Sequence, residues 1–125
     1  MFLLAMVNLW SVHLETAPCA NRFIGHTDWD HIQVLPFFLP AYKQKSLIRI
    51  FGYERARVRL ARIRARQMET PHFPVSLREL PGNLAIEELK EMEFQIGRVT
   101  AGCKFANHPS ISAGYRLCTS SVSIA

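Results

Sequence analysis

The sequence has no CxxC metal-binding pair, no apolar run long enough to cross a membrane, and no internal repeat. Its three cysteines, Cys19, Cys103 and Cys118, are an odd number at irregular spacing, which argues against a disulfide framework and favours reduced thiols. The opening stretch MFLLAMVNLW lacks the basic residue that starts a signal peptide, and a spanning helix needs ~20 apolar residues. We therefore expect a cytoplasmic chain with no membrane partner.

The composition fits one folded domain. A length of 125 residues allows one domain and not two, and a hydrophobic content of 49% excludes general disorder. The formal net charge is +5, which favours anionic partners. Nine of the 15 lysine and arginine residues lie between Lys43 and Arg66, so the positive charge is concentrated in one part of the chain.

Apolar patterns predict strands alternating with one long helix. Strand patterns end at Gly25 and cover residues 46–52, 84–89, 93–105 and 113–119. Residues 54–68 predict a helix whose apolar stripe is Val58, Ala61, Ala65 and Met68. Strands alternating with a helix favour an α/β or α+β layered domain. We assign residues 1–22 to an uncertain N-terminal segment and residues 23–125 to the domain.

The stretch FIGHTDWDHIQ, residues 23–33, carries four candidate metal ligands: His26, Asp28, Asp30 and His31. Imidazole and carboxylate groups are the usual nitrogen and oxygen ligands of zinc. In an extended loop, alternate residues point to one side, so His26, Asp28 and Asp30 are expected to converge. His31 would point elsewhere and serve a second ion. His108, in the segment FANHPSISAGYR, is a fifth candidate.

Other roles are open for these side chains. Asp and His in a loop are often solvated, and Asp30 is in position to cap a short helix beginning at His31. The spacing by itself is suggestive of a metal site and does not define one.

Three separated segments resemble one family. HTDWDHIQVLPFFLPAY resembles the HxHxDH loop of metallo-β-lactamase-fold hydrolases, most of all the branch that reads His-Thr-His-Trp-Asp-His-Ile-Gln-Gly-Phe-Pro-Phe-Phe. That branch is similar to ribonuclease Z and to phosphodiesterases of the same fold. QMETPHFPVSLRELPG and FANHPSISAGYRL extend the likeness over roughly residues 23–118. The resemblance implies an α/β fold, a partial metallo-β-lactamase αββα sandwich made of a mixed sheet with flanking helices.

The resemblance also implies roles for individual residues. His26, Asp28 and His108 would hold one zinc ion, and Asp30 with His31 the other. Asp30 would also lie near the attacking water and is the expected catalytic residue. The implied cofactor is Zn²⁺, one or two ions, with Mn²⁺ or Fe²⁺ as alternatives. The implied reaction is hydrolysis of a phosphodiester or nucleotide-like substrate by a metal-bound hydroxide.

Three departures from the family pattern lower the expected activity. Asp28 stands where the family has its second histidine, and the added negative charge should raise the pKa of a metal-bound water. Val34 stands where the branch has glycine. After Arg116, the sequence offers neither the bridging aspartate nor the final histidine of the family. We therefore expect a truncated domain, inefficient in turnover, that a second copy or a partner chain would complete.

The expected helix also suggests a rival function. Arg55, Arg59, Arg62 and Arg66 recur at i, i+4, i+7 and i+11 and would form one basic face. Such a face attracts phosphate backbones, so the rival reading is a non-catalytic remnant that binds metal or nucleic acid through residues 55–66. The alternative is a solvated amphipathic helix whose arginine stems cover apolar surface. No aromatic residue interleaves with these arginines, which argues against a stacking platform for single strands.

Overall fold

The computed structural model describes residues 8–11, 19–54, 60–107, 109 and 111–124. It describes the side chains of these residues except those of residues 8–11 and of Asp30. The predicted arginines Arg55 and Arg59 and the predicted ligand His108 therefore lie outside the described residues.

The first sheet is mixed and has four strands in the order β1-β2-β3-β4. β1 pairs antiparallel with β2, whereas β2, β3 and β4 run parallel. Parallel strands are covered on both faces and therefore have near-continuous apolar sequences, as in LIRIFGY of β3. The strands are β1 (Asn8–Ser11), β2 (Cys19–Ile24), β3 (Leu47–Tyr53) and β4 (Asn83–Leu89).

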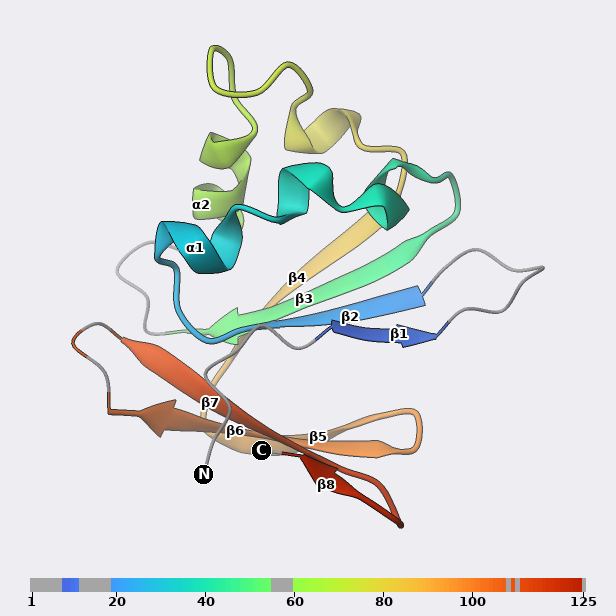
Figure 1. Cartoon of the computed structure of the whole chain (residues 1–125), viewed down its shortest axis with the longest axis vertical. Helices are drawn as coiled ribbons and strands as arrows, with labels where there is room; N and C mark the ends of the chain where they lie inside the picture. Colours follow the sequence, from blue (N-terminus) through green and yellow to red (C-terminus); the bar gives the residue numbers. More distant parts are fainter. Residues whose placement is uncertain (1–7, 12–18, 55–59, 108, 110, 125) are drawn as a thin grey trace.

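Short helices cover one face of the first sheet (Figure 1). They come from the two crossover connections that parallel strands need, one between β2 and β3 and one between β3 and β4. The side chain of Glu88 on β4 accepts a hydrogen bond of 2.7 Å from the Leu60 backbone N–H, which attaches the longest helix to the sheet. The helices are α1 (Trp29–Ile32), α2 (Leu60–Gln67) and the 3-10 turns η1 (Leu35–Phe37), η2 (Leu39–Tyr42) and η3 (Leu77–Glu79).

The second sheet is antiparallel and lies against the other face of the first sheet (Figure 1). Its order is β5-β6-β7-β8, with strands β5 (Met92–Ile96), β6 (Val99–Ala106), β7 (Ser112–Cys118) and β8 (Ser123–Ile124). Its outer face carries exposed polar side chains, among them Glu93, Lys104 and Arg116. Within the described ranges no helix covers that face, so the flanking helices expected on both sides are found on one side only.

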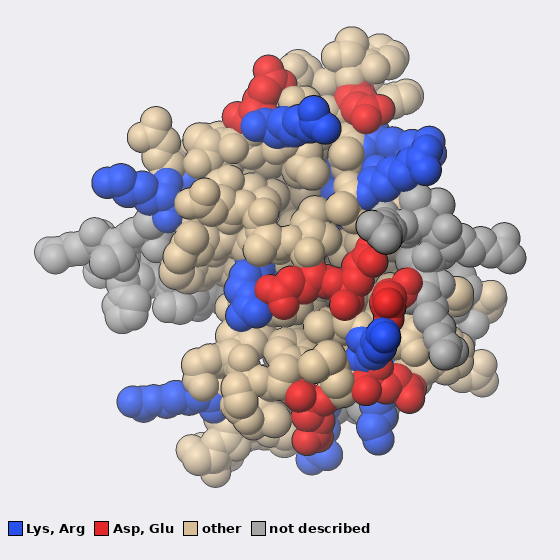
Figure 2. Space-filling model, turned by 180° about the vertical axis from the view of Figure 1, so that it is seen from behind, with Lys and Arg blue, Asp and Glu red and all other residues tan. Residues whose placement is uncertain are grey.

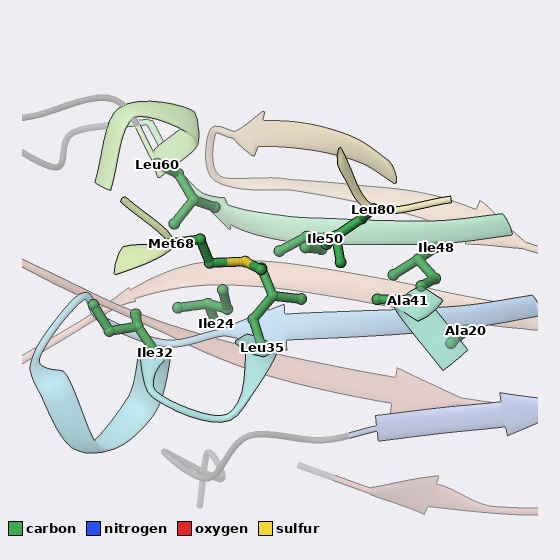
Figure 3. Packing of buried hydrophobic residues seen from close by; sticks show 10 residues of the cluster. All are labelled: Ala20, Ile24, Ile32, Leu35, Ala41, Ile48, Ile50, Leu60, Met68 and Leu80. Atoms are coloured by element: carbon green, nitrogen blue, oxygen red, sulfur yellow. The ribbon is translucent and has the colours of Figure 1, made fainter. Parts of the chain in front are cut away.

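Two apolar cores separate the three layers. The first lies between the helices and the first sheet, where Figure 3 shows Leu35 and Met68 directed toward one another over β2 and β3. The second lies between the sheets and contains Phe23 and Phe51, whose rings stack with centroids 5.1 Å apart. Alternate residues of β2 and β3 face the two cores, because successive side chains of a strand point to opposite faces.

The helix α2 buries a different face from the predicted one. Met68 is buried as expected, but Ala61 is exposed, and the buried residues of the helix are Leu60, Arg64 and Gln67. Burying a leucine removes more apolar surface from water than burying an alanine, so the helix turns Leu60 toward the sheet. A Cβ atom at Gly52 would lie 2.5 Å from the Leu60 Cδ2 methyl group, so a larger residue there would require the Leu60 side chain to shift.

The strand predicted over residues 93–105 is in fact a hairpin of β5 and β6. Ile96 pairs with Val99, which leaves Gly97 and Arg98 as a two-residue loop. Gly97 has a φ of +58°, and glycine at the first of two loop positions is the pattern of a type II′ hairpin. The single glycine between two apolar runs was the signal that the strand prediction missed.

Tyr115 of β7 joins the two sheets. Its side chain is 4% exposed, its ring lies 5.1 Å from that of Phe23, and its hydroxyl donates a 2.9 Å hydrogen bond to the Ile24 carbonyl. Burial raises the pKa of Tyr115 above its usual range, so the hydroxyl keeps the proton that it donates. Burial also raises the pKa of the neighbouring Cys103 thiol to about 11.

We predict that Tyr115→Phe lowers the free energy of unfolding by roughly 1–3 kcal/mol, because the buried Ile24 carbonyl loses its donor while the ring packing is kept. Urea unfolding measures the change. Tyr53→Phe is the matched control, because Tyr53 is half-buried and its hydroxyl makes no hydrogen bond to another described residue. Equal unfolding midpoints for the two variants would show that the Tyr115 hydroxyl does not hold the sheets together.

Candidate metal centre

The predicted ligand loop follows β2 at the carboxyl end of the parallel strands. This is the edge at which open α/β sheets bind their ligands. The loop begins at Gly25 and passes His26 and Thr27, and α1 starts at Trp29 with Asp28 as its N-terminal cap position. The alternative that Asp30 caps a helix beginning at His31 was therefore wrong, because the helix begins two residues earlier.

Strand β7 holds this loop in place from the second sheet. The Ala113 backbone N–H donates a 2.7 Å hydrogen bond to the Gly25 carbonyl, next to the bond from Tyr115 to Ile24. Ile111 lies beside Gly25 and His26 in the lining of one small hollow. Ile111, the residue before β7, therefore lies near the ligand loop.

His26 is buried, with 7% of its surface exposed, and lies close to Asp28. Its Nδ1 atom is 3.4 Å from the Asp28 backbone nitrogen and 3.4 Å from the Asp28 carboxylate oxygen Oδ2. One ring nitrogen cannot accept a hydrogen bond from the first group and donate one to the second at the same time. In either tautomer Nδ1 faces Asp28, so Nε2 is the atom through which His26 would bind a metal.

His31 lies against His26. The centroids of the two imidazole rings are 3.7 Å apart, with an angle of 44° between the rings. The expectation that His31 points elsewhere was therefore wrong. It assumed an extended chain, whereas the first turn of α1 bends the backbone and brings His31 back toward the loop.

The structure brings three of the five predicted ligands together, namely His26, Asp28 and His31. The side chain of Asp30 and all of His108 lie outside what it describes. Among the described side chains, no group of three or more His, Cys, Asp or Glu residues is arranged to hold a metal ion. Two imidazoles and one carboxylate are side chains of the kind that zinc binds.

Two buried arginines lie beneath the helices near this loop. Arg64 of α2 donates hydrogen bonds through Nη1 to the Ile32 carbonyl of α1 and to Gln67 Oε1. Burial lowers the pKa of Arg64 to about 9, and the positive charge of Arg22 contributes to the shift. Burial also lowers the pKa of Arg22, to about 10, so both remain charged at neutral pH. Arg64 is thus not a solvated side chain of the helix, because its guanidinium is buried and binds the end of α1.

The predicted basic face is described only in part. Arg62 and Arg66 are exposed as predicted, and neither forms an ion pair with a described residue. Figure 2 shows the molecule from the side opposite to that of Figure 1, and on this face acidic side chains are interspersed with basic ones. The ion pairs Arg49–Glu87 and Lys90–Glu54 join β3, β4 and the segments that follow them. This mixed charge does not favour a polyanion.

Of the comparisons with known proteins, only the one with solved structures found a similar protein, and that likeness concerns the fold. No family model matches the sequence, and no curated protein matches it. Among solved structures, the chain is similar to the crystal structure of the metallo-beta-lactamase fold protein YhfI from Bacillus subtilis, with a TM-score of 0.50 and 9% sequence identity. The match covers 98% of this chain and 58% of that one. The mixed α/β chain with two sheets thus has a likeness in fold to a metallo-β-lactamase-fold protein, along 58% of that protein's length.

Proposed function

We propose that this chain is a metal-dependent hydrolase of the metallo-β-lactamase superfamily, related to the ribonuclease Z and phosphodiesterase branch. The observation that carries the proposal is the contact of two imidazole rings, 3.7 Å apart, in a loop that β7 fixes at the carboxyl end of β2. The fold likeness to YhfI supports it at the level of architecture. The αββα sandwich and the cytoplasmic location belong to the same proposal.

In the proposed site His26, Asp28 and His108 hold one ion, and Asp30 with His31 hold the other. Zinc, when bound, would supply a Lewis acid for the phosphodiester and lower the pKa of water. His26 would bind through Nε2, and the Asp28 carboxylate, which lies at Nδ1 in this structure, would have to turn toward the same ion. Asp30 would orient the attacking water by accepting a hydrogen bond from it. The burial of His26 keeps water away from one side of the site and fixes the ring.

We expect the purified chain, stripped with a chelator, to bind Zn²⁺ in isothermal titration calorimetry. His26→Ala and His31→Ala should each weaken the binding by ~10-fold or more, about 1.4 kcal/mol, because each removes a nitrogen ligand. His72→Ala is the matched control, because His72 is exposed and lies outside the loop. Equal affinities for all three variants and the parent would overturn the metal assignment.

The negative charge of Asp28 is expected to lower the rate of hydrolysis. Its carboxylate adds negative charge beside the proposed ion, which opposes ionisation of a metal-bound water. We predict that Asp28→His raises hydrolysis of bis(p-nitrophenyl) phosphate at pH 7 by ~10-fold, a lowering of the barrier by about 1.4 kcal/mol. Asp28→Asn removes the charge without adding a nitrogen ligand and should gain less. A rate for Asp28→His at or below that of the parent, at equal metal content, would contradict this role.

Nucleic-acid binding is the second candidate, and the exposure of Arg62 and Arg66 favours it. We predict that Arg62→Gln weakens the affinity for a single-stranded RNA oligonucleotide and lowers the slope of log K against log salt by ~0.7, because one phosphate contact is lost. Fluorescence anisotropy at several salt concentrations measures both. The zinc affinity should stay unchanged. An RNA affinity that does not depend on salt would exclude this function.

A further inference from the structure

A hollow between α1 and α2 lies next to the candidate metal loop and has a different chemistry. Its volume is about 390 Å³, which is in the range of about 300–1,000 Å³ of small-molecule sites. The residues that line it are Trp29, Ile32, Ile63, Arg66, Gln67 and His72. They come from both helices and from the turn after α2, so only the folded chain forms this helix groove.

The lining of the helix groove includes one large aromatic side chain and two aliphatic side chains. Ile32 is buried and Ile63 half-buried, whereas Trp29 exposes 63% of its surface. An indole that remains exposed beside a hollow offers a flat face on which another ring can stack. Trp29 thus supplies the aromatic group that the sequence around the arginines lacks.

A buried amide in the lining has an unused donor. Gln67 is 7% exposed, and its Oε1 accepts the hydrogen bond from Arg64 Nη1. Arginine has only donors, so this contact fixes which end of the amide faces Arg64. Gln67 Nε2 then has no hydrogen-bond partner among the described residues. A buried donor without a partner costs stability, which a ligand with an acceptor atom would recover.

The rim of the helix groove carries a cation that can bind an anion. Arg66 is exposed and forms no ion pair with a described residue. A guanidinium matches the geometry of phosphate through two parallel hydrogen bonds. His72, also exposed, lies on the same rim and adds a second nitrogen.

We propose that the helix groove binds a mononucleotide, with its base stacked on Trp29 and within reach of the Gln67 amide, and its phosphate on Arg66. This site does not require a metal ion and so goes beyond the proposed hydrolase. A larger hollow of about 820 Å³ has two carboxylates, Glu54 and Glu91, and one lysine, Lys90, in its lining, and this net negative charge disfavours the same ligand.

The test uses adenosine 5′-monophosphate as the probe, with the full chain in a buffer containing EDTA, and follows binding by calorimetry. Trp29→Ala and Arg66→Gln should each weaken binding by about fivefold or more, the effect of losing one stacking or one phosphate contact. Arg78→Gln is the matched control, because Arg78 is exposed but does not line the groove. Ribose 5-phosphate, which lacks the base, should bind at least about fivefold more weakly than the nucleotide.

Three outcomes would overturn the proposal. The first is no saturable binding of the nucleotide up to millimolar concentration by a chain whose circular dichroism melt is cooperative. The second is an equal loss of affinity in Arg78→Gln and Arg66→Gln, which would assign binding to the general positive charge of the chain. The third is equal binding of ribose 5-phosphate. Because EDTA is present throughout, none of these results depends on whether the loop around His26 holds zinc.

Discussion

The contacts between β7 and the end of β2 are the constraint on which the candidate metal centre depends. Tyr115 and Ala113 donate hydrogen bonds to the carbonyls of Ile24 and Gly25, the last two residues before His26. These bonds join the two sheets at the point where the ligand loop begins. The inter-sheet core of Phe23, Phe51 and Tyr115 excludes water from them, which makes each bond more costly to lose.

Arg64 has the corresponding role on the helix side. Its guanidinium is fully buried, and two of its nitrogens, Nε and Nη2, have no partner among the described residues. Burying such a group is costly, and Arg22 nearby adds repulsion. The hydrogen bonds to the Ile32 carbonyl and to Gln67 Oε1 offset part of that cost and fix α1 on α2. The same bonds thereby position α1, which carries His31, beside the ligand loop, and they position Gln67 in the helix groove.

The two candidate sites share α1, which links their chemistry. Trp29 lies between Asp28 and Asp30 in sequence and lines the helix groove, while His31, two residues later, contacts His26. A helix of four residues has little stability of its own, so its position depends on Ile32 in the helix-side core and on Arg64. A ligand in the groove and an ion in the loop would therefore act on the same short element.

The sequence by itself determined the strands β3, β4 and β7, the end of β2 and the buried Met68. It also placed His26, Asp28, Asp30 and His31 directly after a buried strand. Apolar runs and local spacing decide these features, and both are properties of the chain itself. It did not determine the hairpin at Gly97, the buried face of α2, or the contact of His26 with His31. It also did not place Trp29 beside Arg66 or Arg64 under α1. Only the tertiary structure decided these, because they depend on which distant elements compete for the same buried surface and on which carbonyl a buried donor can reach.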